Sequence, residues 1–112
     1  MIKSQNQEIC RTYGSGFSPV SERDIIGYSS IKSGLWPLNG LRHQPSKGYS
    51  GWYIWWGENL PGESDFFKPI HLNHVEFIGV NFRQYLSLEP GWRWLLAPDY
   101  VDVWFDANVA QN

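Results

Sequence analysis

The sequence predicts a small α+β domain, and three observations support this fold class. The chain has 112 residues, a length at which one domain buries roughly two thirds of the surface of its unfolded chain. Residues 52–56 and 92–105 carry the apolar patterns of β-strands. Residues 70–86 carry apolar side chains at spacings of three and four, as a helix packed on a sheet does. We therefore expect a small antiparallel sheet with this helix packed against it.

The first part of the chain has the weakest patterns. Residues 1–20 are polar and contain several glycines and serines, so we expect a poorly ordered segment that docks only around residues 9–13. Residues 21–24 fit a capping box and predict a short helical turn. Residues 28–31 predict an edge strand. The single α+β domain is therefore expected to span residues 21–112.

A proline interrupts the next apolar stretch, residues 34–43. Pro37 has no backbone N–H to donate and favours an extended conformation at Trp36. Asn39-Gly40 is a turn dipeptide. We therefore expect an edge strand or an ordered loop here, followed by a surface loop over residues 44–50.

The sequence Gly-Trp-Tyr-Ile-Trp-Trp-Gly at residues 51–57 predicts the central strand. Alternate residues of a strand point to opposite faces, and here both faces carry tryptophan. A strand with two apolar faces is covered on both sides. A helix is the alternative for a short apolar run, but large β-favouring side chains between glycines argue against it. We expect residues 52–56 to lie in the middle of the sheet.

The segment after residue 66 is the best candidate for a helix, over about residues 70–86. Pro69 suits a first helical position, and Gly79 is expected to kink or divide the helix. Pro90 and Gly91 end the segment. The apolar stripe of this predicted helix consists of Val75, Ile78, Phe82, Tyr85 and Leu86.

The C-terminal part predicts a β-hairpin of residues 92–96 and 101–105. Pro98 suits the second position of a type I turn between the two strands. One register pairs apolar residues on the core side and leaves a polar outer side. Its pairs are Trp92 with Phe105, Trp94 with Val103 and Leu96 with Val101 on the core side, and Arg93 with Trp104 and Leu95 with Asp102 on the outer side, with Asp106 one step beyond.

Composition and charge argue against several classes of protein. The formal net charge is −2, which gives no general attraction to nucleic acid. No apolar run approaches the ~20 residues of a membrane span, and the first residues lack the apolar core of a signal peptide. Cys10 is the single cysteine, so no internal disulfide forms. We therefore expect a cytoplasmic protein that binds neither nucleic acid nor membrane, and its oligomeric state stays open.

The titratable residues form no recognisable catalytic or metal motif. His71 and His74 stand three apart, but a zinc motif needs further ligands at fixed spacing. Asp102 and Asp106 would lie about 13 Å apart along one strand, which is too far for a carboxylate pair. Asp99 is explained by the hairpin turn. We expect no catalytic residue, no metal and no cofactor.

Two groups of residues are candidate binding sites. Aromatic side chains make up 17% of the chain, more than a core of this size needs, so some are available for a surface. One candidate is the outer side of the hairpin, where a tryptophan beside arginine and aspartate has the composition of an interface anchor. The other is an aromatic pocket, in which Arg42 either contacts a ligand or holds its loop through carbonyl oxygens or Glu58. The first group is Arg93, Asp102, Trp104 and Asp106, and the second is Trp36, Asn39, Arg42, His43, Trp55 and Glu58.

Five blocks of the sequence carry aromatic motifs that specify the fold better than an activity. They are residues 36–43, 51–55, 65–69, 91–93 and 99–106. They resemble bacterial proteins grouped as immunity protein 33-like, over about two thirds of the chain from residue 34 onward. The resemblance implies a cytoplasmic, non-enzymatic, single-domain protein that neutralises a cognate toxin by binding it.

Two functions from different classes follow from these observations. The surplus of aromatic residues and the absence of catalytic motifs favour a protein-binding inhibitor. Residues 51–112 also hold three basic and eight acidic side chains, which indicates an acidic surface. The alternative is a small-molecule-binding domain or minor enzyme with an aromatic-lined pocket. A deep aromatic cleft would favour the pocket, and an acidic face with Trp104 exposed would favour the inhibitor.

Overall fold

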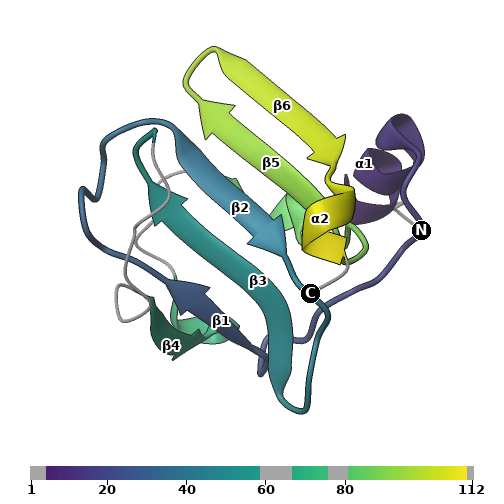
Figure 1. The fold of residues 1–112 in the computed structure, drawn as a ribbon, viewed down its shortest axis with the longest axis horizontal. Coiled ribbons are helices and arrows are strands. Elements are labelled where there is room, and N and C mark those ends of the chain that lie inside the picture. The colour runs from purple at the N-terminus through teal and green to yellow at the C-terminus, as the bar shows by residue number, and fades with distance from the viewer. Residues whose placement is uncertain (1–4, 59–66, 76–80, 111–112) are drawn as a thin grey trace.

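The computed structural model describes residues 5–58, 67–75 and 81–110, and a mixed β-sheet forms its centre (Figure 1). The order of the six described strands across the sheet is β4-β1-β3-β2-β5-β6. The described elements confirm the α+β class. The strands are β1 (Ile25–Tyr28), β2 (Leu38–Arg42), β3 (Tyr49–Trp56), β4 (Lys68–His71), β5 (Trp92–Ala97) and β6 (Tyr100–Phe105), and the helices are α1 (Gln5–Tyr13), the 3₁₀ turns η2 (Leu72–His74) and η3 (Arg83–Tyr85), and α2 (Ala107–Ala110).

Strand β3 is the central strand that the sequence predicted. It pairs with β1 on one side and with β2 on the other. Trp52 and Ile54 are buried on one face of the sheet, and Trp55 is buried on the other, all at 2% exposure or less. Both faces of β3 are therefore covered, as its apolar sequence requires.

The prediction of an antiparallel sheet is right for four of the five described strand pairs. The exception is β1, which runs parallel to β3 with Tyr28 beside Ile54. The direction of β1 depends on the path that the chain takes between β1 and β2. Local hydrophobic pattern does not encode that path.

The stretch predicted as an edge strand or an ordered loop at residues 34–43 contributes a strand inside the sheet, and of the edge strand predicted at residues 28–31 only Tyr28 is in a strand. Strand β2 lies between β3 and β5, and it begins directly after Pro37, so the missing N–H removes no ladder hydrogen bond. Strand β1 ends at Tyr28, where the predicted edge strand began, and lies between β4 and β3. The helical turn predicted at residues 21–24 is instead a turn closed by a hydrogen bond from the Ser21 N–H to Asp24 Oδ2.

The helix predicted over residues 70–86 is wrong. The described part of this stretch consists of the end of β4, η2 and η3, and Ile78 and Gly79 lie outside the described residues. Pro69 lies in the edge strand β4, where a missing N–H is tolerated. Spacings of three and four also occur in short 3₁₀ turns and their flanks, so the pattern identified the buried residues but not their conformation. Those buried residues are Val75, Phe82, Tyr85 and Leu86.

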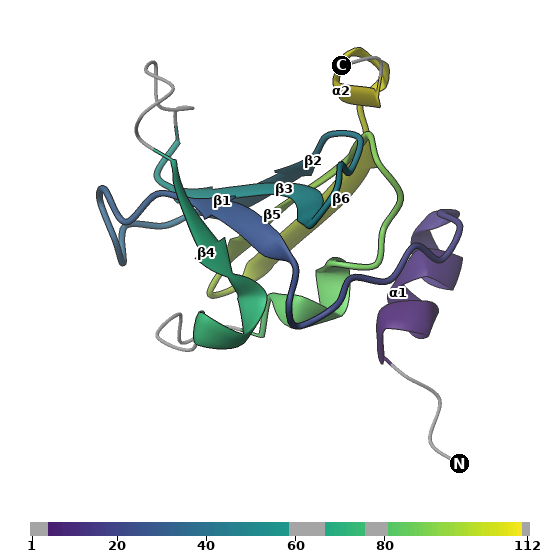
Figure 2. The same ribbon diagram turned by 90° about the horizontal axis from the view of Figure 1, so that it is seen from below.

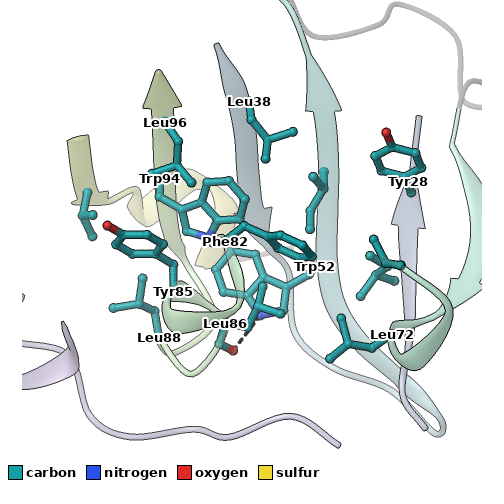
Figure 3. Packing of buried hydrophobic residues seen from close by; sticks show 14 of the residues in the cluster. Tyr28, Leu38, Trp52, Leu72, Phe82, Tyr85, Leu86, Leu88, Trp94 and Leu96 are labelled. Carbon is teal, nitrogen blue, oxygen red and sulfur yellow. Dashed lines mark hydrogen bonds between the residues drawn. The ribbon is translucent and has the colours of Figure 1, made fainter. Parts of the chain in front are cut away.

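One face of the sheet packs against α1, η2 and η3, while α2 lies toward the other face (Figure 2). Trp94 lies in the middle of the packed face with no exposed surface (Figure 3). Its ring centroid is 5.9 Å from that of Trp52, 6.0 Å from that of Tyr85 and 6.4 Å from that of Phe82. A Cβ on Gly40 of the neighbouring strand would overlap the Trp94 indole. Glycine at this position therefore lets the indole lie flat on the sheet.

Residues 5–13, which the sequence indicated to be largely unordered, form helix α1. Asn6 Nδ2 donates to the Arg83 carbonyl and to Ser87 Oγ, each at 3.0 Å. Cys10 is 3% exposed, and its Sγ donates to the Ser87 carbonyl at 3.3 Å. The helix is polar except for this narrow contact, which explains why its composition resembles that of an unordered segment.

The thiol of Cys10 reports on the docking of α1. Burial raises the pKa of this thiol above its ordinary value, and the thiolate is the form that reacts. We expect Cys10 to react with Ellman's reagent at pH 8 far more slowly in the native protein than in urea. Equal rates in the two states would show that α1 does not stay docked on η3.

The C-terminal hairpin has the predicted register. Trp92 lies opposite Phe105, Trp94 opposite Val103, and Arg93 opposite Trp104. One detail differs from the prediction. Val101 and Phe105 point to the core side but are 47% and 50% exposed, because β6 is the last described strand of the sheet.

Candidate functional site

The outer side of the hairpin brings Arg93, Trp104 and Asp106 into contact. The Arg93 guanidinium carbon lies 5.1 Å from the centroid of the Trp104 ring, within the range of a cation–π interaction. Its Nη1 lies 3.3 Å from Asp106 Oδ2. Asp106 Oδ1 also accepts the N–H of Asn108 at 3.0 Å, at the start of α2. Arg93 therefore links the aromatic ring of β6 to the start of α2.

Asp102 is the most accessible acid of this surface. It stands two residues before Trp104 on β6, so both side chains point to the same side of the sheet. The Tyr100 hydroxyl approaches Asp102 Oδ2 at 3.5 Å, beyond the usual hydrogen-bond length. Asp102 thus presents its carboxylate to solvent beside a tryptophan. We call Arg93, Asp102, Trp104 and Asp106 the hairpin face.

The ion pair within the hairpin face orients side chains more than it stabilises the fold. The side chains of Arg93 and Asp106 are 27% and 23% exposed, and pairs that solvent reaches contribute little to stability. Arg93 Nε is buried and has no hydrogen-bond partner among the described residues. The guanidinium therefore keeps a donor that the described part of the chain does not use.

The six residues of the predicted aromatic pocket do not converge on one site. Trp36 is 37% exposed and packs edge-to-face on Trp56, whereas Trp55 is 2% exposed on the outer side of β3. Asn39 is buried, and its Nδ2 donates to the Gly57 carbonyl at 2.7 Å. Glu58 is exposed at the end of β3. Trp36 and Asn39 therefore make contacts within the fold.

Arg42 donates hydrogen bonds to backbone carbonyl oxygens, which was one of the alternatives that the sequence left open. The residue is 2% exposed. Its Nε donates to the Ser50 carbonyl at 2.9 Å, and its Nη1 donates to the Ser18 and Leu88 carbonyls at 2.7 Å each. Desolvation lowers the pKa of this guanidinium. Arg42 ties three separate segments to the end of β2 and has no surface left for a ligand.

His43 lines a cavity whose lining includes none of the other five residues of the predicted pocket. The cavity has a volume of about 330 Å³, at the lower end of the range for ligand sites. Tyr53 stands between His43 and Phe67, with ring centroids 5.4 Å and 5.2 Å away and the rings nearly perpendicular. The other lining residues are Ile25, Ile26, Gly27, Gln44, Ser46, Tyr49, Gly51, Trp52 and Pro69.

Sequence reasoning missed this cavity because its walls come from segments far apart in the chain. One signal was present, since glycine inside a strand often marks a close approach of another group. A Cβ on Gly27 would lie 2.7 Å from the Tyr53 ring. The Tyr53 ring of strand β3 therefore lies over Gly27 of the neighbouring strand β1.

The described residues offer no candidate metal centre. No group of three or more His, Cys, Asp or Glu side chains lies close enough together to hold an ion in the described ranges. The rings of His71 and His74 lie 5.9 Å apart, and His71 Nδ1 lies 2.8 Å from the Arg23 carbonyl. No described helix has the length and apolar character needed to cross a membrane.

Comparison with known proteins identifies one family. The family model of the Imm33-like domain matches residues 5–106. This range includes α1 and every described strand, so the whole sheet and the hairpin face lie within it. Nothing among the curated proteins and nothing among the solved structures matches the chain.

Proposed function

The chain belongs to the Imm33-like domain family, and from this premise we propose that it is a non-enzymatic binding module that neutralises a cognate bacterial toxin by stoichiometric binding. The observation that carries the proposal is the hairpin face. Arg93 fixes the Trp104 ring beside the exposed carboxylate of Asp102. A rigid aromatic group next to charges is the usual composition of an interface hot spot.

The charge of the C-terminal part supports a basic partner. Residues 51–112 hold eight acidic and three basic side chains, and Asp102, Asp106 and Asp99 all lie on or next to the hairpin. Charges at the rim of an interface mainly raise the association rate and set the orientation of the partner. Binding should therefore be fast at low salt and slower at high salt.

Reversal of the charge at Asp102 tests the proposal. Asp102→Lys is expected to slow association with the partner by about tenfold and to leave Tm within about 3 °C of the native value. Asp106 is unsuitable for this purpose, because it also pairs with Arg93 and bonds to the start of α2. The partner is captured from an extract of the source cells and identified by mass spectrometry, and kinetics are then measured on the two purified proteins.

Glu8→Lys is the matched control for this reversal. It makes the same change in net charge on α1, which lies against the opposite face of the sheet (Figure 2). Glu8 is exposed and contacts Arg11 in an exposed ion pair, and exposed ion pairs contribute little to stability. Equal slowing by Glu8→Lys and Asp102→Lys would reflect overall charge and would contradict a role for the hairpin face.

The cavity beside Tyr53 favours a second candidate function, small-molecule binding. Its perpendicular aromatic walls and its hydroxyl and imidazole groups suit a small ligand that is partly aromatic and partly polar. Native mass spectrometry of the protein purified from source cells tests it. A metabolite retained at a ratio of one to one, and lost in Tyr53→Ala, would favour this function over toxin binding.

A further inference from the structure

The two edges of the described sheet differ in their protection against pairing with another strand. Edge strand β4 has the sequence Lys-Pro-Ile-His, and lysine and proline are the residues that commonly block edges. Edge strand β6 has the sequence Tyr-Val-Asp-Val-Trp-Phe, and its pairing with β5 continues from Ala97 to Trp92 without a bulge. Tyr100, Val101 and Phe105 of β6 are 47–55% exposed. Strand β6 is thus an unbroken edge strand with three half-exposed apolar side chains, and it runs along one margin of the described sheet (Figure 1).

The hydrogen bonds of the hairpin show which backbone groups of β6 face outward. The Asp106 N–H donates to the Gly91 carbonyl at 2.8 Å, so this pair lies on the hydrogen-bonded positions of the ladder. These positions alternate with non-bonded positions along an antiparallel pair. The N–H and carbonyl groups of Val101, Val103 and Phe105 therefore point away from β5, toward the open edge.

We propose that two copies of this chain pair edge to edge through β6, antiparallel and with Val103 at the two-fold axis. Val101 of each copy then lies opposite Phe105 of the second copy, and the outward groups of both strands form about six hydrogen bonds. The described sheets of the two copies become continuous. This inference goes beyond the proposed function, because it concerns self-association through the edge of β6 and not the binding of a toxin.

The side chains of β6 select this register. On the core side, the half-exposed Val101 and Phe105 cover each other across the axis. On the outer side, Asp102 lies opposite Trp104 of the second copy, and Arg93 of that copy, which stacks on the Trp104 ring, lies one strand further in. The Arg93 Nε without a described partner belongs to the same guanidinium.

Neighbouring registers place like charges together. A shift toward the hairpin turn sets Asp102 opposite Asp102 of the second copy, and a shift the other way sets Asp102 opposite Asp106. Like charges directly opposite each other destabilise a strand pair. The pairing about Val103 avoids both contacts and keeps most of β6 within the interface, so charge complementarity favours a second copy as the occupant.

A concentration series of the purified chain tests the proposal without any partner. We expect sedimentation velocity to show a reversible monomer–dimer equilibrium for the native protein. Val101→Lys should raise the dissociation constant of the dimer at least about tenfold, because it places an ammonium opposite Phe105 at both ends of the interface. The matched control is Leu35→Lys, which changes another exposed apolar residue (54% exposed) away from β6 and should leave the equilibrium unchanged.

Amide exchange locates the interface. The amides of Val101, Val103 and Phe105 should exchange rapidly in dilute protein and become protected at high concentration. A native protein that stays monomeric at millimolar concentration would overturn the proposal, as would a dimer that Val101→Lys leaves intact. Protection of these three amides only after a toxin is added would assign the edge to a strand of that partner instead, and would also overturn it. Val101→Lys retains the hairpin face, so a monomeric variant that still binds the partner separates this inference from the proposed function.

Discussion

Replacement of Trp94 by alanine is expected to lower the free energy of unfolding by about 3–5 kcal/mol, as large-to-small changes in a core do. The indole has no exposed surface and touches the rings of Trp52, Phe82 and Tyr85 (Figure 3). Gly40 leaves the space that the indole fills, and neither the sheet nor the 3₁₀ turns can collapse into it easily. Urea melts monitored by far-ultraviolet circular dichroism measure the loss.

Two further variants separate packing from other effects. Trp94→Phe should cost clearly less, because it keeps an aromatic ring and removes a buried indole N–H that has no hydrogen-bond partner among the described residues. Trp104→Ala should cost about 1 kcal/mol, since its ring is partly exposed and loses chiefly the contact with Arg93. A larger loss for Trp104→Ala than for Trp94→Ala would make the hairpin face structural and would weaken the proposed binding role.

Replacement of Arg42 by methionine is expected to cost at least about 3 kcal/mol. Methionine keeps most of the apolar stem but leaves the carbonyls of Ser18, Ser50 and Leu88 without their donor. Each buried acceptor left unsatisfied costs about 1–3 kcal/mol, and removal of the buried charge offsets part of the sum. Chemical denaturation gives the loss in stability.

The lysine variant shows whether charge or geometry matters at this position. Arg42→Lys keeps a positive charge, but its ammonium group cannot reach carbonyls on three sides as the planar guanidinium of arginine does. We expect it to recover less than half of the stability lost in Arg42→Met. Full recovery by lysine would show that the charge of Arg42, rather than its fork of hydrogen bonds, holds these segments together.

Trp94, whose loss is expected to destabilise the fold, and Asp102, whose reversal tests binding, lie on opposite sides of one hairpin. Trp94 alternates with Arg93 along β5, so core and hairpin face are one residue apart. The tightly packed side holds β5 and β6 in place, and the outer side presents Arg93, Trp104 and Asp102. A rigid aromatic surface loses little conformational entropy when it binds, which suits a stoichiometric inhibitor.

The sequence by itself determined the local parts of this fold. It predicted the strand at residues 52–56, the hairpin with its register, and the burial of Phe82, Tyr85 and Leu86. These features depend on side-chain alternation and on a short turn, and both act within a few residues. The contact between Arg93 and Trp104 follows from the same register.

Only the tertiary structure decided how these parts are arranged. The parallel pairing of β1 with β3, the interior place of β2, the docking of α1 and the carbonyl contacts of Arg42 all join segments that are distant in the chain. Such contacts depend on which fold of the whole chain buries its apolar groups and satisfies its hydrogen bonds best. The local sequence pattern is compatible with several such folds. The apolar residues at spacings of three and four within residues 70–86 are the clearest example, because a helix and a pair of 3₁₀ turns bury the same side chains.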